Sequence, residues 1–119
     1  MKSYLFTFSQ PCTPAQAHDV LNNTEGVQTW IAPFPYSAIL VSRLNSQDLS
    51  ATLRERLPND VWFMVAEMAP QAVDGWLPGN LWEYVNDPQK AWSQQLIRTI
   101  ADPKYLRRPI ADADRVPGT

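Results

Sequence analysis

The chain has little cysteine and histidine, with one residue of each among its 119. A single cysteine excludes a disulfide within the chain and a zinc site built from four cysteines. A single histidine excludes histidine-rich metal sites and leaves His18 as the one candidate base for a nucleophilic triad. These residue types predict no cofactor, and an unpaired cysteine is typical of a reducing compartment.

Long apolar runs are also missing. The N-terminal stretch alternates between apolar and polar residues and is interrupted by Pro11, which is unlike the apolar core of a signal peptide. No run approaches the roughly 18 apolar residues that a membrane-spanning helix needs. We therefore expect a cytoplasmic protein that makes no membrane contact.

An excess of positive charge is absent, since 10 Lys and Arg face 12 Asp and Glu. This balance argues against a dedicated nucleic-acid binder, whose affinity comes largely from neutralising phosphates. One local cluster nevertheless predicts a contact site for nucleic acid or for a protein partner, because an aromatic ring inside it could stack on a base. The alternative is a solvated helix end. The cluster consists of Arg98, Lys104, Tyr105, Arg107 and Arg108.

What the chain does have is an ordinary apolar content of 45%, which suffices to bury a core. Residues 2–9 alternate, with Tyr4, Phe6 and Phe8 on one face, and this predicts a strand. Thr13 followed by Pro14 predicts the start of a helix that runs to about residue 22.

The segments after this helix predict three more strands and a second helix. Strands are predicted over 27–32, 37–42 and 61–68, and a helix with Leu49, Leu53 and Leu57 on one face precedes the last of them. The order β-α-β-β-α-β predicts an α+β, ferredoxin-like fold. We expect a four-stranded antiparallel sheet in the order 4-1-3-2, with both helices on one face.

The C-terminal third predicts a helical extension. A short helix is expected around 81–85 and a longer one from Pro88 to about Ile100, followed by a tail. We divide the chain into a ferredoxin-like domain, residues 1–87, and a C-terminal helix and tail, residues 88–119. The second part is expected to pack on the same domain or on a partner subunit.

Both faces of the predicted sheet are apolar. The last strand places Phe63 and Val65 on one face and Trp62 and Met64 on the other. Helices cover only one face, and a soluble monomer rarely exposes a large apolar patch. We therefore predict a homodimer, although the C-terminal third could cover part of the second face. The predicted dimer face consists of Tyr4, Phe6, Phe8, Trp62 and Met64.

Two stretches resemble the SinR-like proteins of bacteria and phages, relatives of a small CRISPR-associated endoribonuclease and of VapD-type toxins. They are the opening strand, residues 2–8, and the segment of residues 61–86, which includes the turn Gly75-Trp76-Leu77. The resemblance covers about residues 2–87. It implies a ferredoxin-like fold and a homodimer packed through its sheets.

The resemblance fails at the position that matters for catalysis. Nuclease members of the family carry an aspartate at the end of the first strand, where this chain has Ser9 and Gln10. A hydroxyl or an amide alone binds Mg²⁺ poorly. We expect a non-catalytic protein that acts through homodimerisation and through binding an unidentified partner, as an accessory subunit or an inhibitor. The alternatives are a metal-dependent endonuclease and a nucleic-acid binder without cleavage.

Four other polar side chains are predicted to be structural rather than catalytic. We expect Cys12 to be a small packing residue and His18 to be exposed on its helix. Glu67 is expected to pair with Lys2 or Arg43 near the sheet edge. Asp74 is expected to bind backbone N–H groups of its turn.

Overall fold

The computed structural model describes residues 1–94, and its strands and helices follow the predicted order. Three predicted strands are shorter than expected: residues 2–9 reduce to 2–8, residues 27–32 reduce to 29–31, and residues 61–68 reduce to 63–67. The elements up to the fourth strand are β1 Lys2–Phe8, α1 Pro14–Asn22, β2 Thr29–Ile31, β3 Ser37–Ser42, α2 Ser46–Arg56 and β4 Phe63–Glu67.

The four strands form one antiparallel sheet in the order β2-β3-β1-β4. The strands β1 and β3 are therefore central, as predicted. Every residue of β3 from Ala38 to Ser42 is buried, which explains its nearly continuous apolar run. The strands β2 and β4 lie at the two edges.

Helix α1 begins at the residue that the sequence predicts, and both helices of this part have a side-chain cap at the N-terminus. The Thr13 hydroxyl accepts the backbone N–H of Gln16 at 3.1 Å, and the Gln16 side chain accepts the backbone N–H of Thr13 at 2.9 Å. At α2, the Asn45 side chain accepts the backbone N–H of Asp48 at 2.7 Å. Each cap provides an acceptor for an N–H group that has no partner within the helix.

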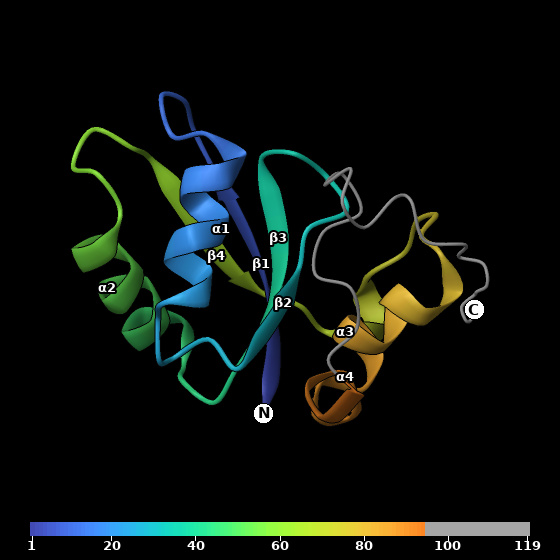
Figure 1. The fold of residues 1–119 in the computed structure, drawn as a ribbon. Helices are drawn as coiled ribbons and strands as arrows, with labels where there is room; N and C mark the ends of the chain where they lie inside the picture. The colour runs from blue at the N-terminus through green and yellow to red at the C-terminus, as the bar shows by residue number, and fades with distance from the viewer. Residues whose placement is uncertain (95–119) are drawn as a thin grey trace.

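The main core lies between one face of the sheet and the helices α1 and α2, which lie together on that side (Figure 1). Leu49 and Leu53 are fully buried against it. The sheet contributes the aromatic side chains of its first strand, and the buried members of the core include Tyr4, Phe6, Phe8, Trp30, Leu40 and Val61.

The C-terminal segment covers part of the opposite face. It contains two 3-10 turns, Pro70–Ala72 and Gly79–Trp82, and the helices α3 Glu83–Asn86 and α4 Pro88–Gln94. Figure 1 shows α3 and α4 across the sheet from α1 and α2. A second core forms there from Ile31, Ile39, Val41, Leu81, Tyr84, Val85 and Ala91.

Helix α4 belongs to this second core even though the predicted domain boundary falls just before it. Its Ala91 is fully buried, and the guanidinium of Arg43, the residue after β3, lies 5.1 Å from the centre of the Trp92 ring. In this structure α4 is therefore part of the same core as β2 and β3. The remainder of the predicted helix, including Leu96 and Ile100, lies outside the described residues.

Candidate association surface

The face of the sheet opposite α1 and α2 is here called the outer face, and within residues 1–94 it is covered at one end only. Antiparallel register aligns Ser3 with Val41 and Leu5 with Ile39 across the two central strands. At the covered end, Tyr84 is completely buried, and the Ser3 hydroxyl donates a hydrogen bond to its backbone carbonyl. The buried hydroxyl of Ser3 thus has its hydrogen-bond partner in the C-terminal layer.

The other end of the outer face is open. Leu5 is 39% exposed, Met64 is 66% exposed and Trp62 is 81% exposed. Ala66, which faces Leu5 in the register of β1 and β4, is also exposed. We call these four side chains the outer-face patch. Leu5, Met64 and Ala66 lie on one side of two neighbouring strands, and Trp62 immediately precedes β4.

An apolar pocket of about 160 Å³ lies between the sheet and the C-terminal segment. Leu5 and Ile39 line it from the sheet, and Leu77 and Trp82 line it from the C-terminal segment. Trp76 stands at this pocket with its side chain 99% exposed, which is unusual for the largest apolar residue type. Apolar surface therefore continues from the patch onto the C-terminal segment.

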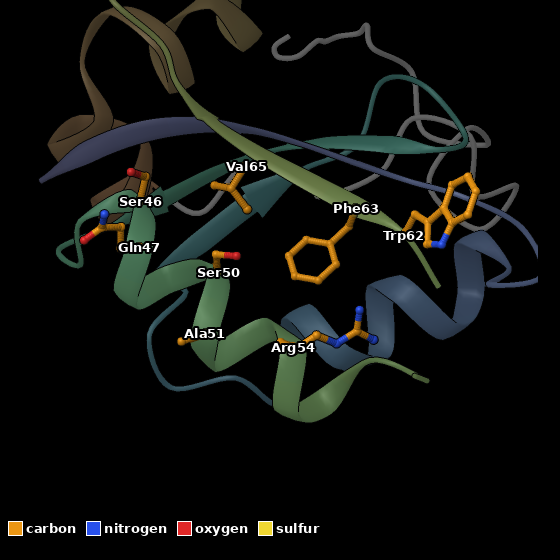
Figure 2. Close-up of a pocket in the computed structure, with 8 residues that line it drawn as sticks. All are labelled: Ser46, Gln47, Ser50, Ala51, Arg54, Trp62, Phe63 and Val65. Atoms are coloured by element: carbon orange, nitrogen blue, oxygen red, sulfur yellow. The ribbon is translucent and has the colours of Figure 1, made fainter. Parts of the chain in front are cut away.

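A groove of about 740 Å³ runs between β4 and α2 on the helix side of the sheet. Figure 2 shows the Phe63 ring pointing from β4 into this space, toward Arg54 of α2. The wall formed by α2 consists mostly of small or uncharged side chains. The lining residues are Ser46, Gln47, Ser50, Ala51, Arg54, Trp62, Phe63 and Val65.

Among the described residues that line this groove, Arg54 is the one cation, and its guanidinium is hydrogen-bonded to backbone carbonyls of the same chain. The Arg54 guanidinium donates hydrogen bonds to the carbonyls of Val61, at 2.8 Å, of Leu57 and of Pro58. It also lies 5.2 Å from the centre of the Phe63 ring. Arg54 therefore closes the turn before β4 and lines one end of the groove.

The predicted dimer face is wrong in part. Tyr4 and Phe6 are completely buried and Phe8 nearly so, all on the side of α1 and α2. Trp62 and Met64 lie on the opposite side, because Phe6 faces Val65 and Thr7 faces Met64 in the register. The five residues thus belong to two faces of the sheet, and only the last two are accessible.

The register also shows which residues the sequence reasoning missed. Leu5, which alternates with Tyr4, and Ala66 complete the outer-face patch. Leu5 could have been found from its place between the aromatic residues of the first strand. For the exposure of Trp76, the available signal was its position beside Gly75 in a turn-rich segment.

Ser9 and Gln10, at the position of the nuclease carboxylate, both make structural hydrogen bonds. The Ser9 hydroxyl accepts the backbone N–H of Trp62 at 2.9 Å, and the Gln10 amide donates to the Tyr36 hydroxyl at 3.3 Å. Within residues 1–94 no three His, Cys, Asp or Glu side chains are grouped so that they could hold a metal ion.

The other polar candidates are placed as follows. Cys12 is 1% exposed, and burial raises the pKa of its thiol. His18 differs from the expectation: it is half-buried and stacks on Trp30, with ring centroids 4.8 Å apart. Glu67 pairs with Lys2 at 3.5 Å, and Asp74 accepts the backbone N–H of Gly75 at 2.8 Å.

The predicted basic contact site lies outside the described residues. It consists of Arg98, Lys104, Tyr105, Arg107 and Arg108. No helix in the described part of the chain is long and apolar enough to cross a membrane.

Comparisons of the chain with protein-family models, with curated proteins and with solved structures found no match.

Proposed function

We propose that this chain is a small, non-catalytic ferredoxin-like protein that acts by association, forming a homodimer and binding a further protein. The observation that carries the proposal is the outer-face patch, which stays exposed although the C-terminal segment covers the rest of that face. Exposed apolar surface of this kind is characteristic of interaction sites in soluble proteins. The element order and the strand order support the ferredoxin-like assignment.

Ser9 and Gln10, which stand at the position of the nuclease aspartate in the resembled family, both make other hydrogen bonds in this chain. Ser9 holds the start of β4 through the N–H of Trp62. This favours association over phosphodiester cleavage, since a hydroxyl is a poor ligand for a hard divalent cation.

The proposal is tested by measuring the mass of the chain in solution by sedimentation equilibrium at micromolar concentration. The expected mass is twice the 13.5 kDa of one chain. Replacing Trp62 and Met64 together by serine should weaken the dimer, whereas replacing the exposed Gln71 and Gln89 by serine should leave it unchanged. A mass of one chain for the wild type at the highest attainable concentration would contradict the proposal.

A further inference from the structure

The free edge of the sheet at β4 offers backbone groups for another strand. β4 pairs with β1 along one side, and no strand within residues 1–94 pairs with its other side. Natural edge strands are commonly protected by lysine, proline or a bulge. β4 has the sequence Phe-Met-Val-Ala-Glu, and its single charge lies at its last residue.

The hydrogen bonds of β1 and β4 show which groups are free. Met68 donates its N–H to the Ser3 carbonyl, and Ser9 donates its N–H to the Trp62 carbonyl, both at 2.9 Å. Residues two apart on an antiparallel strand direct their backbone groups the same way. Those of Met64 and Ala66 therefore point to β1. The N–H and C=O groups of Phe63, Val65 and Glu67 point away from the sheet.

From this arrangement we infer that two copies of the chain pair β4 with β4, antiparallel, about a two-fold axis at Val65, so that their sheets join into one. This inference deepens the proposed function by naming the surface through which the homodimer forms.

The register centred on Val65 uses every free backbone group of the edge. Val65 faces Val65 of the second copy, and Phe63 faces Glu67. Each of these facing pairs exchanges two hydrogen bonds, which gives about six across the junction. A register shifted along the strand would leave some of the outward groups without a partner.

Side chains fit the same register on both faces of the sheet. On the outer face, Met64 lies across from the small Ala66 of the second copy, and the two outer-face patches become continuous. On the helix side, Glu67 of one copy lies across from Phe63 of the other, whose ring carries the Arg54 guanidinium 5.2 Å from its centre. The register therefore brings the Glu67 carboxylate of one copy toward the Arg54 guanidinium of the other, and no two groups of like charge face each other.

The groove between β4 and α2 provides the space for this pairing. An added strand lies about 4.8 Å from β4, and the groove there measures about 740 Å³. The α2 wall carries Ser46, Ser50 and Ala51, whose small side chains allow the second copy to approach closely.

The pairing is tested with two substitutions at Val65 in the full chain. Val65→Pro removes an outward N–H that makes no bond within the sheet, and edge strands tolerate proline at such positions. We expect this variant to keep the wild-type circular dichroism and to sediment at the mass of one chain. The matched control, Val65→Thr, keeps the N–H and should sediment like the wild type.

A cysteine scan along β4 tests the register independently of how proline affects folding. Among Met64→Cys, Val65→Cys and Ala66→Cys, we expect oxidation to link two chains fastest for Val65→Cys, because only residue 65 faces itself. The native Cys12 is buried and should not contribute. Equal cross-linking at the three positions, or a maximum at another one, would overturn the inference.

The outcomes separate this inference from the proposed function. If Val65→Pro remains dimeric and Val65→Cys fails to cross-link, edge pairing is wrong while the homodimer stands, and the outer-face patch is then its interface. If the wild type itself sediments as one chain, both are wrong. In that case an extended segment of another protein becomes the remaining occupant of the edge.

Discussion

Two hydrogen bonds join Ser9 and Trp62, and they connect the end of β1 to the start of β4. The Ser9 N–H donates to the Trp62 carbonyl, and the Ser9 hydroxyl accepts the Trp62 N–H, both at 2.9 Å. In the second of these hydrogen bonds the acceptor is the Ser9 side chain, and it lies just beyond the last paired residues of β1 and β4. Trp62 thus keeps a fixed backbone while its side chain remains 81% exposed.

Replacing Ser9 by alanine should lower the free energy of unfolding by about 0.5–1.5 kcal/mol, because the Trp62 N–H loses its acceptor. The exposed Gln71→Ala variant serves as the control and should unfold like the wild type. Urea unfolding followed by circular dichroism measures both. An unchanged midpoint for Ser9→Ala would mean that water replaces the hydroxyl without loss.

Substitutions on opposite sides of helix α2 test whether Leu53 belongs to the core, as the structure shows. Leu53 is completely buried, so Leu53→Ala should lower the free energy of unfolding by about 2–5 kcal/mol. Glu55→Ala, on the exposed side of the same helix, should change it by less than about 0.5 kcal/mol. Equal effects of the two substitutions would contradict the observed orientation of the helix.

Local features of this chain are predictable from its sequence, whereas the register between distant strands is not. The caps at Thr13 and Asn45 were predictable because each depends on residues within three positions along the chain. The sorting of alternate residues into two faces was also correct within β1 and within β4. Which face of β1 joins which face of β4 depends on the register between strands far apart in sequence. Both faces of the sheet are apolar, so alternation alone does not show which residues of β4 share a face with Tyr4. The sequence places Tyr4 with Trp62 and Met64, whereas in the structure it shares a face with Phe63 and Val65.

The thiol of Cys12 should react slowly with an aromatic disulfide reagent at neutral pH. The side chain is 1% exposed, and burial raises the pKa of the thiol, so the reactive thiolate is scarce. We expect labelling at least about tenfold slower than that of the chain unfolded in urea, where burial is lost. Labelling at the same rate in both conditions would show that the segment before α1 is not packed.

Tyr4 should make the protein less stable at alkaline pH. Burial, and next the carboxylate of Glu67, raise the pKa of the Tyr4 phenol above the ordinary value of 10.0. The folded state therefore keeps its proton where the unfolded chain has lost it, and stability falls as pH rises above about 10. The phenol also donates a hydrogen bond of 2.6 Å to the Leu44 carbonyl.

Unfolding measured between neutral pH and about pH 11 checks this behaviour. Tyr4→Phe should be less stable at neutral pH by about 1 kcal/mol, through the lost hydrogen bond. It should also lose less stability than the wild type as the pH is raised. Tyr36→Phe, at an exposed ring, is the control and should retain the wild-type dependence. The same slope in the Tyr4 variant and the wild type would contradict the assignment.

The last prediction concerns the C-terminal layer, whose contact with the outer face determines how much apolar surface remains for association. Tyr84 is completely buried there, and its carbonyl accepts the Ser3 hydroxyl. Tyr84→Ala should therefore lower the free energy of unfolding by about 3–5 kcal/mol, as large aromatic deletions in a core do. Trp76→Ala removes a larger ring that is 99% exposed and should change the free energy of unfolding by less than about 0.5 kcal/mol.

Both variants are compared with the wild type at one protein concentration, because the stability of a dimer depends on concentration. If Tyr84→Ala proved as mild as Trp76→Ala, the C-terminal segment would not pack on the sheet as described. The surface left for a second copy would then include Ile39 and Val41 as well.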